Sequence, residues 1–168
     1  MRAVLARAGG GAPSRLRRPV IPLAGWLALC IGGAALVALE FPPDAWFGAL
    51  VRPGPWPPPA MLAAVFAVLL GLSSVAAWRV DRRRQPQRAY ALRLFLVQLA
   101  LGFAWLAILL GGHALGAAVA VLAVMWLALV ATVVAFCRLD RVAGLIATPY
   151  LAWITLVLQQ NIALWSLN

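Results

Sequence analysis

Charged residues are scarce in this sequence, and acidic ones are scarcer still. Of its 168 residues, 11% are charged and four are Asp or Glu, whereas 65% are hydrophobic. A water-soluble domain of this length needs far more charge to cover its surface. Lysine is missing: all fourteen basic residues are Arg. These arginines fall in short clusters between long apolar runs. Soluble nucleic-acid-binding proteins spread basic residues over a folded face, so we expect no nucleic-acid partner despite the net charge of +10.

Residues with catalytic or metal-binding chemistry are equally few. The two cysteines, Cys30 and Cys137, are isolated from each other, so we interpret them as packing residues rather than as a disulfide or metal site. The single histidine, His113, is interpreted as a solvated turn residue. No acidic residue falls in the middle of an apolar run, where it would indicate an ion path, and Asp81 and Asp140 lie among arginines as expected charge partners. The sequence predicts no catalytic residue, no metal site and no required cofactor.

Five long apolar runs fill most of the chain, at about residues 20–39, 60–80, 92–110, 115–137 and 142–164. A helix needs ~20 apolar residues to cross a bilayer, at a rise of 1.5 Å per residue. None of the runs alternates between apolar and polar residues as the strands of a β-barrel do, and backbone groups in lipid must be satisfied within their own segment. The predicted fold class is therefore all-α, an integral membrane bundle of five transmembrane helices. Short connections make the last three helices antiparallel neighbours.

The arginines are divided unequally between the two sides of this predicted bundle. Thirteen precede the first run or lie in, or at the run ends beside, the connections after the second and fourth runs, and Arg52 alone lies on the opposite side. Basic residues remain cytoplasmic, so we expect the N-terminus in the cytoplasm and the C-terminus outside. Residues 1–19 are Arg-rich, and the run that follows is too long for a signal peptide. We expect a disordered cytoplasmic tail there and one membrane domain over residues 20–168.

Tryptophan is abundant, with eight residues. Indole rings often lie at the headgroup level of a bilayer, where they form an aromatic belt. A belt explains the tryptophans near the ends of the apolar runs, Trp26, Trp78 and Trp165. It explains less well the tryptophans that lie farther inside, Trp105, Trp126 and Trp153. The remaining two flank a Pro-rich loop, Trp46 and Trp56.

Helical spacing places several of these rings beside amide side chains. One face of the fifth run carries Tyr150, Trp153, Val157 and Asn161, and one face of the third carries Gln98, Leu101 and Trp105. An unpaired amide in lipid is costly, so we expect the amides to point into the bundle, namely Gln98, Gln159, Gln160 and Asn161. Amides and rings around a bundle interior suit a flat, mostly apolar ligand. Amides also join membrane helices to one another, and the residues alone leave both interpretations open.

Three motifs resemble the TspO/MBR family, the translocator proteins, also called tryptophan-rich sensory proteins or peripheral benzodiazepine receptors. The first loop has the family's aromatic pair, its basic residue with Pro, and Trp before two prolines, in Trp46-Phe47, Arg52-Pro53 and Trp56-Pro57-Pro58. The other motifs are Gln98-Leu99-Ala100-Leu101 with Trp105, and Pro149-Tyr150-Leu151-Ala152-Trp153 with Asn161. The likeness extends over about residues 26–168. It departs from the family in the second helix, where Phe, Pro, Trp and Tyr are replaced by Ala63, Val65, Ala67 and Leu70.

The resemblance implies a bacterial-type envelope protein that binds porphyrins, haem-type tetrapyrroles or related hydrophobic ligands. Its role would be sensory, regulatory or transport-related, with the first loop as a lid over a helix-bundle pocket. The implied ligand-binding residues are Trp46, Trp56, Gln98, Trp105, Trp126, Tyr150, Trp153 and Asn161. Besides the lipid bilayer and the ligand, the implied partner is a second copy, packed through the small residues of the third run, Ala100, Ala104, Ala107 and Gly111. We expect no enzyme, with two alternatives open: light-dependent porphyrin breakdown by pocket tryptophans, and a ligand-free assembly or regulatory subunit.

Overall fold

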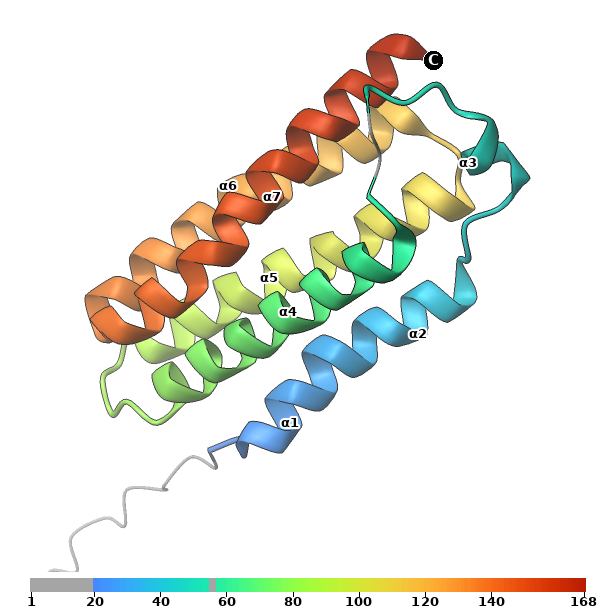
Figure 1. Cartoon of the computed structure of the whole chain (residues 1–168). Coiled ribbons are helices and arrows are strands. Elements are labelled where there is room, and N and C mark those ends of the chain that lie inside the picture. The colour runs from blue at the N-terminus through green and yellow to red at the C-terminus, as the bar shows by residue number, and fades with distance from the viewer. Residues whose placement is uncertain (1–19, 55–56) are drawn as a thin grey trace, which may run out of the picture.

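The computed structural model describes residues 20–54 and 57–168, and every regular element among them is a helix (Figure 1). The first span joins α1 (Leu23–Leu27), the π-helical turn η1 (Ala28–Gly32) and α2 (Gly33–Glu40). The other spans are α4 (Pro59–Asp81), α5 (Arg88–Leu106) continued by the π-helical turn η2 (Ala107–Gly111), α6 (Leu115–Leu139) and α7 (Arg141–Leu167). All five are long and apolar enough to cross a membrane. The predicted all-α bundle of five spans is confirmed.

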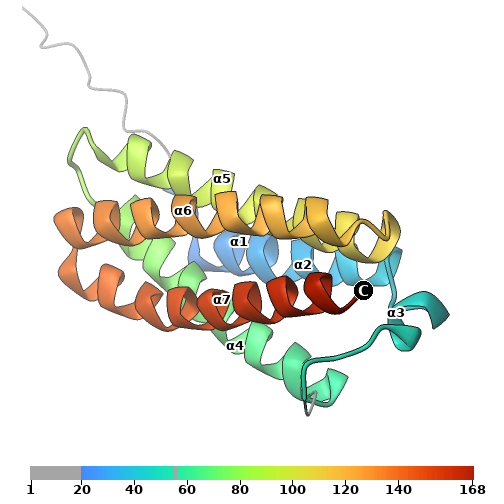
Figure 2. The ribbon, with the colours of Figure 1, turned by 90° about the horizontal axis from the view of Figure 1, so that it is seen from above.

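The spans run antiparallel to their chain neighbours (Figures 1 and 2). Along the bundle α5 packs against α6, α6 against α7, and α7 against α4. The loop between α2 and α4 contains a short helix, α3 (Ala45–Ala49), at the end where α5 meets α6 and where α7 finishes (Figure 1). We call this the loop end of the bundle. The opposite end, where α4 joins α5 and α6 joins α7, is the arginine-rich end.

Two glycines allow helices to approach closely. A Cβ atom at Gly33 would lie 2.6 Å from Cζ of Phe103, so α2 packs tightly on α5 only because this residue has no side chain. A Cβ atom at Gly144 would overlap Sγ of Cys137, so the absence of a side chain at this glycine lets α7 pack closely against α6. Cys30 is buried and both cysteines are free, in agreement with their interpretation as packing residues.

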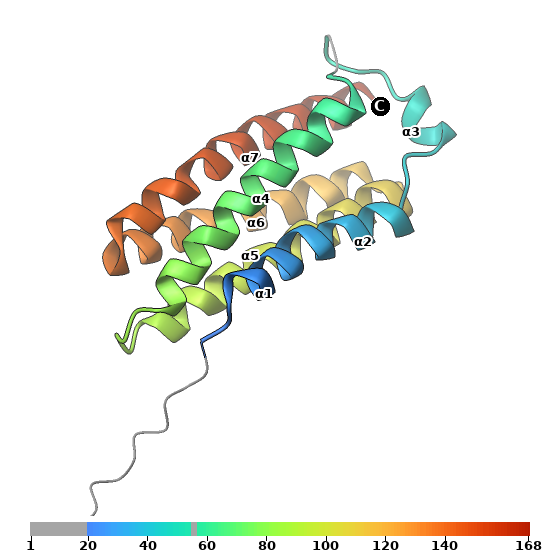
Figure 3. The same cartoon turned by 60° about the horizontal axis from the view of Figure 1, so that its bottom comes forward.

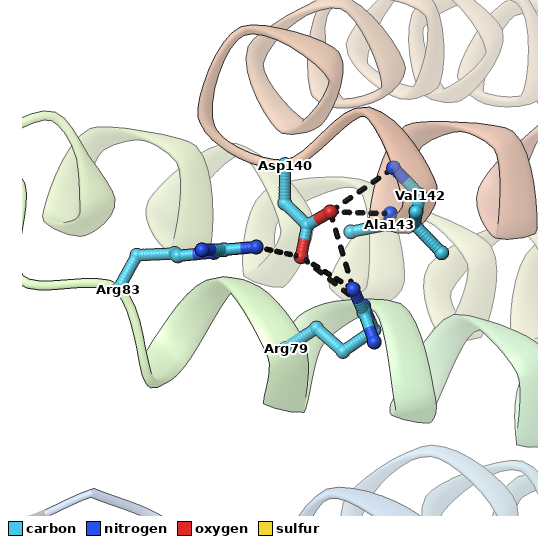
Figure 4. Close-up of polar contacts among 5 residues, drawn as sticks. All are labelled: Arg79, Arg83, Asp140, Val142 and Ala143. Atoms are coloured by element: carbon cyan, nitrogen blue, oxygen red, sulfur yellow. Dashed lines mark hydrogen bonds and ion pairs between the residues drawn. The ribbon is translucent and has the colours of Figure 1, made fainter.

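Asp140 fastens three helices together at the arginine-rich end (Figure 4). Its carboxylate accepts hydrogen bonds from the backbone N–H groups of Val142 and Ala143, which caps the start of α7. It also accepts from the guanidinium groups of Arg79 on α4 and of Arg83 just after α4, at 3.1 and 2.7 Å. Burial raises the pKa of Asp140, but the hydrogen bonds from Arg83 and Ala143 and the charges of both arginines hold it below its ordinary value of 3.8. The carboxylate is therefore charged at neutral pH.

Asp81 makes a second link at the same end. Its Oδ2 accepts a hydrogen bond of 2.8 Å from the N–H of Ile21, just before α1. Arg88, at the start of α5, donates to the backbone oxygen of Asp81 at 2.6 Å and pairs with its carboxylate at 3.6 Å. Both buried aspartates are thus local charge partners, as predicted. Asp81 links the first, second and third spans, and Asp140 links the second span to the junction of the fourth and fifth.

Two expectations about side-chain direction are wrong. Gln159 and Gln160 are exposed, because the buried face of α7 passes through Ile154, Asn161 and Leu164 instead.

The ring of Trp26 is likewise not part of an aromatic belt. It is 2% exposed and packs edge-on against Phe95, with ring centroids 5.7 Å apart. The belt interpretation fits Trp165, which is 54% exposed, and Trp78, which is partly exposed beneath the guanidinium of Arg82.

Candidate ligand-binding cavity

A cavity of about 320 Å³ lies inside the bundle. Sites that hold drug-sized ligands measure about 300–1,000 Å³ and are mainly apolar, so this cavity is at the lower end of that range. Its walls come from all five spans: Ile31, Ala34, Ala35, Ala38, Ala63, Phe66, Ala67, Leu70, Leu99, Gly102, Phe103, Trp105, Leu106, Met125, Tyr150 and Ile154. Only Trp105 and Tyr150 among them have polar side-chain groups. These walls therefore offer no partner to a charged group and favour contact with a largely apolar part of a ligand.

Trp105 is held in place from behind the cavity wall. Its indole Nε1 donates a hydrogen bond of 3.2 Å to Oδ1 of Asn161 on α7, and Nδ2 of Asn161 donates to the backbone oxygen of Val157 at 2.8 Å. Both side chains are buried. Asn161 does not line the cavity, but it fixes the ring that does.

Tyr150 is the second polar residue in the wall. It is 4% exposed, and its hydroxyl group makes no hydrogen bond within residues 20–54 and 57–168. Since a buried hydroxyl group gains from a partner, this group is available to a ligand that carries an acceptor.

Trp153 supports the wall without lining the cavity. It meets Phe66 of α4 edge-on, with ring centroids 5.9 Å apart, and Phe66 faces the cavity. The indole N–H of Trp153 is buried and has no hydrogen-bond partner in the described part of the chain.

Two other predicted binding residues lie away from the cavity. Trp126 donates a hydrogen bond of 2.9 Å to the hydroxyl group of Thr155, which joins α6 to α7. Gln98 is 1% exposed in the core, and its Oε1 atom is buried with no partner among the described residues. The structure therefore brings Trp105 and Tyr150 together at the cavity, while Trp126 and Gln98 face other neighbours.

Trp46 lies at the loop end, on α3. Its ring stacks on His113 in the connection between η2 and α6, with centroids 4.3 Å apart. Nε2 of His113 lies 3.0 Å from Oδ2 of Asp44, whose other oxygen accepts a hydrogen bond from the N–H of Phe47 and so caps α3. That hydrogen bond, together with the neighbouring imidazole, holds the pKa of Asp44 below its ordinary value of 3.8. His113 is exposed, as a turn residue should be, but it also anchors the loop.

Sequence reasoning missed this contact between Trp46, His113 and Asp44. The residues lie on two connections far apart in the chain, and no motif links them. The structure shows that the turn itself is unusual: His113 has φ of 50°, a left-handed conformation that is uncommon outside glycine.

A second contact holds the other side of the loop. Oδ1 of Asn168 accepts a hydrogen bond from the N–H of Val51, and Nδ2 of Asn168 donates one to the backbone oxygen of Val51, both at 3.0 Å. The loop is thus fixed to the η2–α6 turn through Trp46 and to the end of α7 through Val51. The other predicted lid residue, Trp56, lies outside the described residues.

Five antiparallel spans around an apolar cavity, with a short helical loop over one end, define a membrane-embedded helix-bundle protein. The model of the TspO/MBR family matches residues 21–166, so the chain belongs to that family. It is 34% identical over 143 residues to the tryptophan-rich sensory protein of Cereibacter sphaeroides, covering 85% of this chain and 89% of the relative. It is 32% identical over 141 residues to protein CrtK of Rhodobacter capsulatus, covering 83% and 86%. The translocator protein of Homo sapiens is 30% identical over 126 residues, covering 73% and 75%.

Proposed function

We propose that this membrane protein binds a porphyrin or a related hydrophobic ligand in its cavity, in a sensory or transport-related role. The observation that carries the proposal is the wall of the cavity. Among the described residues it is apolar except for an indole ring fixed by Asn161 and a tyrosine whose hydroxyl group has no hydrogen-bond partner there. A flat aromatic ligand gains from contact with Trp105, and its polar edge gains from Tyr150. Two relatives are named tryptophan-rich sensory protein and translocator protein, and these names describe roles of this kind.

The test is a fluorescence titration of the protein in lipid nanodiscs with protoporphyrin IX. A porphyrin bound against Trp105 absorbs where indole emits, so the emission should fall along a saturable curve. Trp165→Phe is the matched control, because that ring is exposed and does not line this cavity. Absence of saturable quenching at micromolar porphyrin overturns the proposal and leaves an assembly or regulatory subunit as the function to pursue.

Light-dependent porphyrin breakdown is a second candidate because an indole borders the cavity. Within the described residues Trp105 is the tryptophan that lines it. Illumination of the porphyrin complex should then consume porphyrin faster in the unmodified protein than in Trp105→Phe. Equal rates at equal occupancy exclude a role for this indole.

The orientation in the membrane is part of the same proposal. Eight of the arginines in the described residues belong to the arginine-rich end or its first helical turns, and Arg52 belongs to the loop end. The rule that basic residues stay cytoplasmic places the α3 loop and Asn168 outside. A reporter enzyme fused after Asn168 should behave as non-cytoplasmic and one fused near Asp81 as cytoplasmic, and the reverse pattern refutes the orientation.

A further inference from the structure

One side of the cavity opens between α2 and α4. Five of its lining residues are exposed at the surface of the chain: Ile31, Ala35, Ala38, Ala63 and Ala67. All five belong to helices long and apolar enough to cross a membrane. Their exposed surface therefore faces the hydrocarbon of the bilayer rather than water. We call this opening the lateral slot.

The lateral slot follows from which helices pack together. Near the arginine-rich end α1 and η1 contact α4, and Ser74 Oγ donates a hydrogen bond of 3.2 Å to the backbone oxygen of Trp26. Toward the loop end α2 packs on α5 instead, where Gly33 meets the ring of Phe103. By contrast, α4 packs against α7, and Phe66 of α4 meets the ring of Trp153 there. Because α2 follows α5 and α4 packs on α7, α2 and α4 diverge toward the loop end, as Figure 3 shows.

Small side chains keep the lateral slot wide. Ala35 and Ala38 are three residues apart on α2, and Ala63 and Ala67 are four apart on α4, so each pair shares one helix face. Ile31 and Ala38 are seven residues apart, or about 10 Å along the helix axis. Larger side chains at these alanines would close the opening. The contacts that anchor the α3 loop lead to His113, in the η2–α6 connection, and to Asn168, just after α7, and not to the two helices beside the slot.

The chemistry of the slot decides what fills it. Within residues 20–54 and 57–168 no charged side chain lines it, so a lipid headgroup has no partner there. Water would lack the two to four polar contacts that hold it in a cavity. An empty slot would lose the dispersion contacts that its walls could make. An alkyl chain satisfies all three conditions, and the surrounding bilayer supplies it at high concentration.

We propose that the lateral slot binds one acyl chain of a bilayer lipid, which passes between α2 and α4 and reaches Trp105 inside the bundle. The headgroup of that lipid stays at the membrane surface near the loop end. The site shares the cavity of the proposed function, and a porphyrin and the chain compete for the same space. The test of the lipid chain site nevertheless does not depend on whether a porphyrin binds.

The test uses vesicles of a phosphatidylcholine that carries a photoactivatable diazirine on one acyl chain. After illumination, adducts are mapped by mass spectrometry of the full-length protein. Lipids around the protein should label exposed residues such as Leu127, which is 62% exposed on α6. A chain in the slot should also label interior residues, Trp105 and Met125, which are 9% and 1% exposed and both line the cavity.

Two variants close the slot from opposite sides, Ala35→Phe on α2 and Ala67→Phe on α4. Each should abolish the interior adducts and leave those on Leu127 in place, which also shows that the variant is folded in the bilayer. The matched control is Ala120→Phe, at an exposed alanine of α6 away from the cavity, and it should keep the interior adducts. Absence of interior adducts in the unmodified protein overturns the proposal, as does their persistence in both slot variants.

A parallel titration separates the two hypotheses about the cavity. Protoporphyrin IX is added to the same vesicles, and both quenching and adducts are measured. Interior adducts without saturable quenching mean that the lipid site exists and the porphyrin proposal fails. Saturable quenching without interior adducts means the reverse. If both are right, porphyrin binding should remove the interior adducts and leave those on Leu127 unchanged. Cross-links from slot residues to a second copy of the chain would show that protein fills the opening, and would refute the lipid site.

Discussion

In the bundle core, the indole Nε1 of Trp105 on α5 donates a hydrogen bond to Oδ1 of Asn161 on α7, at a distance of 3.2 Å. This contact joins the two interpretations of the intramembrane amides that the sequence left open. Asn161 connects two helices, as amides do in membranes, and the residue that it holds is part of a ligand-sized cavity. Removal of the amide should thus affect stability directly and ligand binding only through Trp105.

Asn161→Leu should lower the stability of the bundle more than the affinity for porphyrin. It leaves the indole N–H of Trp105 buried without a partner, at a cost of about 1–3 kcal/mol, although hydrogen bonds between membrane helices average only about 0.6 kcal/mol. Thermal unfolding in detergent measures the loss. Gln160→Leu, at an exposed amide one residue away, should change little. If Asn161→Leu abolishes porphyrin binding and leaves unfolding unchanged, the amide contacts the ligand instead.

Trp105→Phe should weaken porphyrin binding because it removes part of the stacking surface. An aromatic contact contributes ~0.5–1.5 kcal/mol beyond the buried area, which is roughly a two- to tenfold rise in Kd. Quenching titrations of this variant and of Trp153→Phe compare a ring in the cavity wall with one behind it. The smaller effect should belong to Trp153, and the opposite order would mean that the ligand lies nearer α7 than the cavity does.

Acid should loosen the attachment of the α3 loop. The pKa of Asp44 is lowered in the folded protein, first by the N–H of Phe47 and further by His113, so its contribution is present above the ordinary value of 3.8 and is lost as pH falls through the lowered value. Tryptophan emission should report this transition, because Trp46 stacks on His113. The transition should be missing in Asp44→Asn and in Trp46→Phe. An unchanged transition in both would assign it to another group.

Asp140→Ala should be among the most destabilising single substitutions at the arginine-rich end. It removes the cap of α7, worth about 0.5–2 kcal/mol, and leaves Arg79 and Arg83 without their shared carboxylate. Asp140→Asn keeps a capping oxygen and loses the charge, so its unfolding temperature should lie between those of the other two proteins. Since the pKa of Asp140 is also lowered, its stabilising effect should vanish in strong acid, where the unmodified protein and Asp140→Asn should converge.

A homodimer through α5 stays a prediction that the single chain does not test. Ala100 is exposed on this helix and Ala104 partly so, next to the exposed Leu96 and Val97. Small residues in such a row allow two helices to approach closely in lipid. Ala100→Leu should reduce the dimer fraction measured by cross-linking and light scattering, whereas Ala120→Leu on α6 should not. A dimer fraction equal in all three proteins would place the interface elsewhere.

The sequence by itself determined the number, type and approximate limits of the spans. This is because a run of apolar residues must satisfy its backbone groups internally in lipid, which leaves only a helix. It also determined that Asp81 and Asp140 pair with arginines, since each aspartate lies among arginines in the sequence. Three local motifs were enough to indicate the family, and the family match over residues 21–166 confirms it.

Tertiary structure decided what each polar side chain meets. Gln159, Gln160 and Asn161 are consecutive in the sequence, but the rotation of α7 buries only the last of them. His113 and Asp44 become partners because η2 and α3 finish at the same end of the bundle. The lateral slot exists because Gly33 lets α2 follow α5 while α4 follows α7. Hydrophobic length is a property of one segment, whereas these contacts depend on how several rigid helices turn and pack against one another.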